Sequence, residues 1–190
     1  MDTTHEPLVL PYPMPGERVR AAAWNLHLSE EGTQEQKEWI GPAEDLPRPW
    51  DIATCADPQL RLEVWEWYEA FVTWFNHEYV WDPSAGMIPP CWPRHPTLVH
   101  EIGVLADQRR TIATATNSNS LEEWHRLAVP AFLERMRDRT KQHCDDHHQP
   151  WPARARFVRH RADSMARSGY FDADLSVNQA PLGAGQAGSG

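Results

Sequence analysis

The chain has 190 residues, which suits one domain with tails, because a typical domain takes roughly 100 to 200 residues. Three cysteines are an odd number, which favours reduced thiols or metal ligands over a disulfide framework. The formal net charge is -9 and is uneven: residues 1–90 hold 16 acidic and 5 basic side chains, residues 91–190 hold 11 and 13. The acidic first half argues against non-specific binding of nucleic acid by the whole protein.

Two features of the sequence argue against a membrane protein. No run of about 18 apolar residues is present to cross a bilayer. The first fifteen residues are acidic and rich in proline, whereas a signal peptide is basic and then apolar. We therefore expect a cytoplasmic protein without a membrane partner.

Residues 1–56 are predicted to form an extended arm and linker that contains proline and tryptophan. Four prolines between Pro7 and Pro15 favour extended or polyproline-like backbone. Within this part, residues 18–40 are undecided between helix and strand, because Trp24, Leu26 and Leu28 alternate while the neighbouring alanines suit a helix. A short helix over residues 34–40, ended by Gly41, is one interpretation.

Residues 57–170 are predicted to form a helical domain. Asp57 followed by Pro58 is typical of an N-cap with proline at the first helical position. The apolar residues that follow recur three or four apart, as on one face of a helix. They are Leu60, Val64, Tyr68, Phe71, Phe75 and Tyr79.

Three further helices complete this prediction. Pro96 opens the second, and Ser120 with Glu123 has the spacing of a capping box that opens the third, which Pro130 should kink. A fourth helix is expected over residues 152–168, with Gly169 as its stop. Residues 171–190 are rich in glycine and alanine and are predicted to be disordered. The expected fold is mainly α, a three- or four-helix bundle with an extended proline-rich N-terminal arm and a disordered C-terminal tail.

The second and third helices are predicted to be similar in length and to be joined by a short loop, so they should run antiparallel. The start of one then lies beside the end of the other, which brings Cys91 and His95 near Cys144 and His147. Two thiolates and two imidazoles are ligands that tetrahedral zinc uses. With all four bound, no position stays open for water, so the ion would be structural.

Other interpretations of the same residues remain open. Cys91 also suits a small buried apolar side chain, His95 a helix cap, and residues 142–149 a solvated helix end. A metal-dependent hydrolase or nuclease would instead use His100, Glu101, Asp145, Asp146 and His147 to hold a metal and activate water. No familiar catalytic or phosphate-binding motif accompanies these residues, so the sequence assigns no catalytic residue.

A basic strip lies in the expected fourth helix. Its members are Arg154, Arg156, Arg159, Arg161 and Arg167, against the single acid Asp163. The first four are candidate contacts to nucleic acid. The alternative, which we prefer, is a solvated or internally paired face that balances the acidic first helix.

Three stretches carry a resemblance to a known group of proteins: IPPCWPRHPTLVHEIGVLADQRR, LEEWHRLAVPAFLERM and QHCDDHHQPWPARAR. They resemble uncharacterised actinobacterial proteins with a domain of unknown function, encoded beside conjugation, replication or phage-like genes. The resemblance covers roughly residues 65–161 and implies an accessory protein of a mobile genetic element that acts through a protein partner. On this basis we expect a non-enzymatic interaction protein, with Trp81 and Trp92 near its working surface, and a nucleic-acid-binding protein as the alternative.

Overall fold

The computed structural model describes residues 7–80, 86–140, 144 and 154–178. This part of the chain is mainly helical and contains no strand, which confirms the predicted fold class at that level. The chain divides into two compact units, residues 1–148 and 149–190, and each is described by itself. None of the helices in the described residues has both the length and the apolar composition needed to span a membrane.

Helix α3 (Pro58–Tyr79) is the central helix of the first unit. It begins as the sequence predicts, because the Asp57 side chain accepts a hydrogen bond from the Gln59 N–H at 2.8 Å and Pro58 occupies the first turn. Its apolar face is buried, with Tyr68, Phe71 and Phe75 each 0 % exposed. The helix start and the buried face of α3 are therefore those that the sequence predicts.

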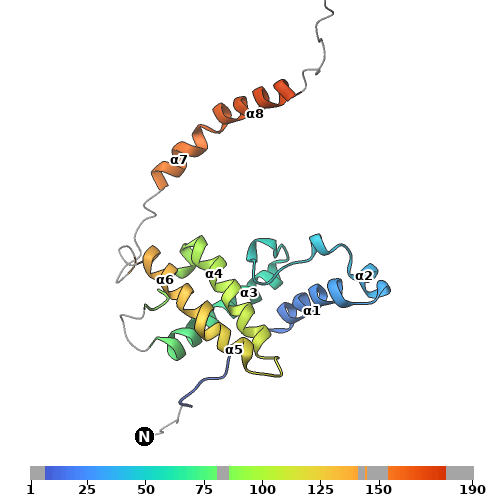
Figure 1. The fold of residues 1–190 in the computed structure, drawn as a ribbon, viewed down its shortest axis with the longest axis vertical. Helices are drawn as coiled ribbons and strands as arrows, with labels where there is room; N and C mark the ends of the chain where they lie inside the picture. Colours follow the sequence, from blue (N-terminus) through green and yellow to red (C-terminus); the bar gives the residue numbers. More distant parts are fainter. Residues whose placement is uncertain (1–6, 81–85, 141–143, 145–153, 179–190) are drawn as a thin grey trace, which may run out of the picture. The chain divides into compact units, whose positions relative to one another are not determined.

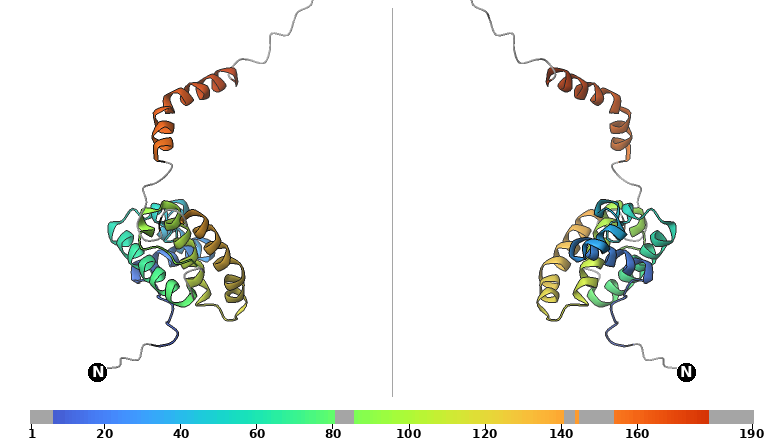
Figure 2. Two further views of the ribbon diagram at one scale, coloured as in Figure 1. Left: turned by 90° about the vertical axis from the view of Figure 1, so that its left-hand side faces the viewer. Right: turned by 90° about the vertical axis from the view of Figure 1, so that its right-hand side faces the viewer.

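Two further helical segments pack with α3. Helix α4 (Pro96–Ile112) contacts α3 and also packs along α5 (Asn119–Glu123), the π-helix η5 (Trp124–Ala128) and α6 (Val129–Thr140). Figures 1 and 2 both show α4 and α6 side by side. Trp124, Phe132 and Met136 complete the buried cluster from this side.

Two details of the third helical segment differ from the prediction. The Ser120–Glu123 capping box is wrong: the helix begins two residues earlier, at Asn119 after Ser118, and the Asn117 side chain accepts from the Asn119 N–H at 3.0 Å. The irregularity expected from Pro130 takes the form of the π-helix before it, in which the Val129 N–H bonds to the Trp124 carbonyl. Proline has no N–H to continue an α-helical ladder, and a π turn changes the bonding pattern just before it.

The first part of the chain also contains helices. Residues 18–40, undecided from the sequence, lie in α1 (Glu17–Glu31) and α2 (Gln34–Ile40). These two helices extend to one side of the packed helices (Figure 1). Single turns of 3-10 helix follow at η1 (Ala43–Asp45) and η2 (Ile52–Thr54).

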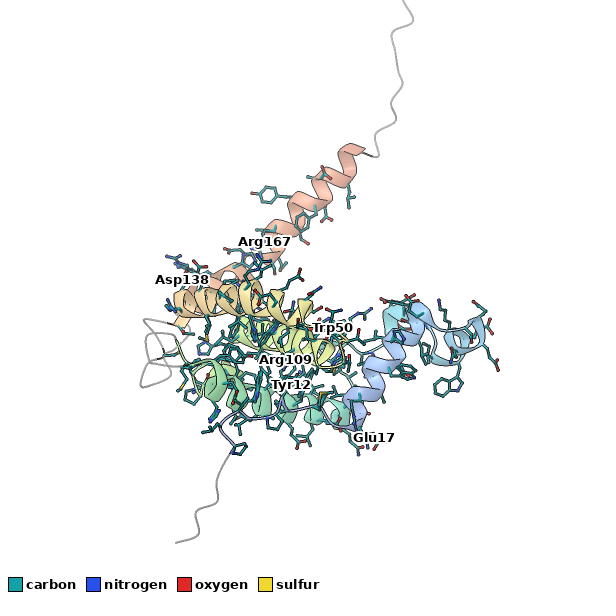
Figure 3. The ribbon with its side chains drawn as sticks, turned by 60° about the horizontal axis from the view of Figure 1, so that its bottom comes forward. Tyr12, Glu17, Trp50, Arg109, Asp138 and Arg167 are labelled. Atoms are coloured by element: carbon teal, nitrogen blue, oxygen red, sulfur yellow. The ribbon has the colours of Figure 1, made fainter. Side chains whose placement is uncertain are left out.

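Residues 7–16 have no regular secondary structure, and Leu10 and Tyr12 within them contact α3 and α4. The Leu10 N–H donates to Glu78 at 2.9 Å, and the Trp74 indole donates to the Leu10 carbonyl at 3.0 Å. The Tyr12 hydroxyl donates to the Ala106 carbonyl at 2.7 Å, and the Arg109 guanidinium lies over the Tyr12 ring (Figure 3). Burial raises the pKa of Tyr12 above its ordinary value.

The second unit contains α7 (Arg154–Ala162) and α8 (Ser164–Asn178). The predicted stop at Gly169 is wrong, because α8 continues through it, and residues 171–178 are helical where disorder was predicted. Glycine inside a helix costs only about 1 kcal/mol relative to alanine, so its neighbours can carry the helix across it. The remaining tail, residues 179–190, lies outside the described residues.

Candidate metal centre

Cys91 and His95 lie in the short connection that leads into α4. Ile88 fixes this connection to α3 through two hydrogen bonds with the Asn76 side-chain amide, at 2.9 and 3.0 Å. A turn of 3-10 helix, η4 (Trp92–Arg94), then brings His95 to the first turn of α4, where its carbonyl accepts from the Val99 N–H at 3.1 Å. The backbone around both residues is therefore held on both sides.

Trp92 anchors this turn from within the core. Its side chain is 2 % exposed, its ring packs against Trp65 and Tyr68, and its indole donates to Glu69 at 3.1 Å. The prediction that Trp92 forms an interaction surface is wrong for that reason: the indole is used to hold the loop. Trp81, predicted for the same surface, lies outside the described residues.

Cys144 reaches the same place from the end of α6. Its N–H donates at 3.1 Å to the carbonyl of Thr140, the residue at which α6 ends. Phe132, Met136, Thr140 and Cys144 follow at intervals of four residues, and all are buried. Cys144 therefore follows the buried stripe of α6 at the same spacing, four residues beyond the last residue of that helix.

The three side chains converge on one point. The Cys91 Sγ lies 3.3 Å from the His95 Nε2, and the Cys144 Sγ lies 3.2 Å from the same nitrogen. The three donor atoms all lie within 4.8 Å of one another. Cys144 is buried, whereas Cys91 and His95 are partly exposed. The predicted meeting of the start of α4 with the end of α6 is confirmed for these three residues, and His147 lies outside the described residues.

These separations fit a tetrahedral ion. With zinc–sulfur and zinc–nitrogen bonds of about 2.3 and 2.1 Å, a tetrahedron separates sulfur from nitrogen by about 3.6 Å and sulfur from sulfur by about 3.8 Å. The observed sulfur–nitrogen distances are a few tenths of an ångström shorter. A small outward movement of the side chains would therefore admit the ion.

The Cys91 thiol favours its protonated form in the metal-free arrangement. Burial, and then the neighbouring Cys144 thiol, raise the pKa of Cys91 above its ordinary value. A thiol is a good ligand only as the thiolate, so a metal that binds here must displace protons. The chemistry that the three groups can offer is metal binding by two sulfurs and one imidazole.

A carboxylate clamp lies beside the centre and was not anticipated from the sequence. Glu101 on α4 accepts from Arg135 at 3.0 Å and also from Arg139, both on α6. The four-residue spacing of the two arginines, on a helix antiparallel to α4, is the signal that could have revealed it. The clamp ties the two helices together within two turns of His95.

Part of the proposed hydrolytic set can be placed. Glu101 is engaged by two guanidinium groups, and the His100 Nδ1 lies 3.7 Å from Asp51. Asp145, Asp146 and His147 lie outside the described residues. Among the described residues, His100 and Glu101 do not belong to the group of donor atoms formed by Cys91, His95 and Cys144.

The basic strip is divided between two helices of the second unit: four of its arginines lie in α7, and Arg167 lies in α8. Arg154 is the first residue of α7, and Arg156, Arg159 and Arg161 have exposed side chains. Phe157 and Val158 are also 43 % and 57 % exposed. An exposed arginine helix with an aromatic side chain can contact nucleic acid, and can equally be a solvated surface.

Comparison of the chain with protein families, curated proteins and solved structures finds no match.

Proposed function

We propose that this protein is a non-enzymatic interaction module whose first unit is fastened at one end by a structural zinc ion. The observation that supports a metal site is the convergence of the Cys91, His95 and Cys144 donor atoms within 4.8 Å of one another. Thiolate and imidazole favour zinc and similar borderline or soft ions over magnesium and calcium, which take oxygen ligands.

The fourth ligand in this proposal is His147, three residues after Cys144. Four protein ligands saturate a tetrahedral ion and leave no position for an activated water, as in structural zinc sites. The ion would then join the start of α4 to the end of α6 and hold a helical surface in place for a partner.

The role of accessory protein of a mobile genetic element belongs to the same proposal and is suggested by the sequence resemblance. A protein partner is its expected target.

Cobalt substitution tests the metal directly. Metal-free protein titrated with Co²⁺ should develop a thiolate-to-metal charge-transfer absorption that saturates at about one ion per chain, with the intense visible bands of a tetrahedral site. Addition of zinc should abolish both. A folded protein that gives only the weak spectrum of octahedral cobalt would contradict the proposal.

Nucleic-acid binding through α7 is the second candidate, favoured by the exposed side chains of Arg156, Arg159 and Arg161. Labelled duplex or single-stranded DNA should shift at low salt, and the shift should weaken steeply as salt rises. The double substitution Arg156→Glu with Arg159→Glu should abolish it. Arg18→Glu with Arg20→Glu, two exposed arginines of α1, is the matched control and should have little effect. Absence of any shift at low salt would eliminate this candidate.

A further inference from the structure

A surface groove lies between α4 and the segment formed by η5 and α6. One hollow of about 290 Å³ is lined by Val104, Leu105, Ala131 and Phe132, among others. A second hollow of about 410 Å³ is lined by residues that include Ile112 and Leu127. Gln108 and Ala128 line both hollows, so the two adjoin along α4.

Small side chains and a helix irregularity account for the space. Ala128 and Ala131 present only methyl groups where α6 and η5 face α4. The π-helix over Trp124–Ala128 lies along the second hollow. Segments of π-helix are rare and occur often at functional sites.

Apolar side chains in the groove remain in contact with water. Val104 is 45 % exposed and Leu127 is 55 % exposed, while the neighbouring Leu105 and Phe132 are buried in the core. The groove therefore has a core-like floor and two large apolar side chains that a partner can cover.

The two ends of the groove differ in charge. Glu101 and Arg135 line the first hollow. Arg139 also bonds to the Glu101 carboxylate, so this cluster has two positive charges and one negative charge. At the second hollow, Asp107 is paired with Arg110, and Glu123 adds one negative charge. A ligand with opposite charges at its two ends would fit in one direction only.

We propose that this groove binds one amphipathic α-helix of a partner protein, with its acidic end at Arg135 and its basic end at Glu123. From Glu101 to Ile112 the groove follows α4 for about 17 Å, which matches about three turns of a helix. An apolar stripe on such a helix, at positions three and four apart, would cover Val104 and Leu127. This inference rests on the proposed role as an interaction module and names its surface and the chemistry of its partner.

The test uses two synthetic helical peptides and the full chain. Both peptides are stapled, carry a fluorescent label and have the same leucine stripe. One has glutamates at one end and lysines at the other, and its twin has the charge order reversed with respect to the stripe. Fluorescence anisotropy should show tighter binding of the peptide whose charges match the groove, by about fivefold or more.

Two pairs of matched variants locate the contact. Leu127→Glu should weaken binding about tenfold or more, whereas Leu62→Glu, at a leucine of α3 that is 58 % exposed, should leave it unchanged. Glu123→Arg should reverse the preference between the two peptides, whereas Glu122→Arg at its exposed neighbour should not. A peptide with the same composition and a central proline should bind poorly.

Several results would overturn the inference. They are no binding of either stapled peptide at millimolar concentration, equal loss with Leu62→Glu and Leu127→Glu, or equal binding of the proline-containing peptide, which would indicate an extended ligand. Metal content measured on the same samples separates this inference from the zinc proposal. Leu127→Glu should retain the metal, so absence of peptide binding would not argue against the metal centre. Absence of metal would in turn leave peptide binding to the groove testable.

Discussion

The Cys144 sulfur lies 3.2 Å from the Nε2 of His95, a residue 49 positions earlier in the chain. The core-facing stripe of α6 leads to Cys144, and the turn anchored by buried Trp92 leads to His95. A metal at this point would close a long loop, and a cross-link of that kind stabilises mainly by restricting the unfolded chain. The stability of the first unit should therefore depend on the ion.

The two buried cysteines should behave differently when they are replaced. Cys144→Ser removes one of two sulfur ligands and should lower zinc affinity at least about tenfold, with a weaker charge-transfer band in the cobalt form because only Cys91 remains as a thiolate. Cys55→Ser is the matched control, because Cys55 is also buried but lies outside the cluster. It should lower the melting temperature while keeping about one metal ion per chain. Equal loss of metal in both variants would indicate general unfolding instead of ligand removal.

Gly103 is required for close packing of α4 on the core. A Cβ at this position would lie 2.6 Å from the Trp50 carbonyl oxygen and would also meet the hydroxyl group of Tyr68. That hydroxyl is itself buried and donates to the Pro49 carbonyl at 2.6 Å. Gly103→Ala should therefore lower the free energy of unfolding by about 2–3 kcal/mol, measured by urea denaturation. Gly169→Ala is the control, because a Cβ at this position in α8 meets nothing within 4 Å, and it should not lower the free energy of unfolding. Equal losses in the two variants would refute the packing argument.

Glu63 of α3 caps the N-terminus of α1. Its carboxylate accepts from the Val19 N–H at 2.8 Å, where Gly16, as N-cap, provides no side chain. Loss of this bond, and of a negative charge at a helix N-terminus, should cost about 1–2 kcal/mol in Glu63→Ala. Glu66→Ala, at an exposed residue of the same helix, should change the free energy of unfolding by less than about 0.5 kcal/mol. A similar loss in both variants would argue against capping.

Glu78 should make the first unit sensitive to acid. The Leu10 N–H, and then His77, hold the pKa of Glu78 below its ordinary value of 4.5. A carboxyl group with a lowered folded pKa adds stability above its unfolded pKa, and that stability is lost as pH falls from about 4.5 through the folded pKa. The difference in free energy of unfolding between wild type and Glu78→Gln should thus shrink as pH falls from about 6 to about 3. A difference that stays constant over this range would contradict this assignment.

The sequence predicts α3 and α4 well because both carry local signals for their starts, Asp57 with Pro58 and Pro96. It also predicts that Cys91 and His95 meet Cys144, because the short loop and similar lengths of two helices determine which ends lie together. These inferences depend on the periodicity and length of helices, which are local properties. They do not require knowledge of individual side-chain contacts.

Other predictions failed where tertiary contacts decide. Trp92 lies in a proline-rich connection, yet its indole is buried against Trp65 and bonded to Glu69. The capping of α1 comes from Glu63, 44 residues away in the chain, which no local pattern can reveal. Gly169 is a plausible helix stop by residue type. A glycine inside a helix costs only about 1 kcal/mol relative to alanine, however, and α8 continues through it.

The most direct test is the metal content of full-length protein purified without a metal-binding tag, with thermal melting before and after treatment with a strong chelator. We expect about one zinc per chain and a large fall in melting temperature on chelation, restored by added zinc. Protein that contains no zinc, binds none when it is supplied, and melts at the same temperature with and without chelator would contradict the proposed structural centre at Cys91, His95 and Cys144.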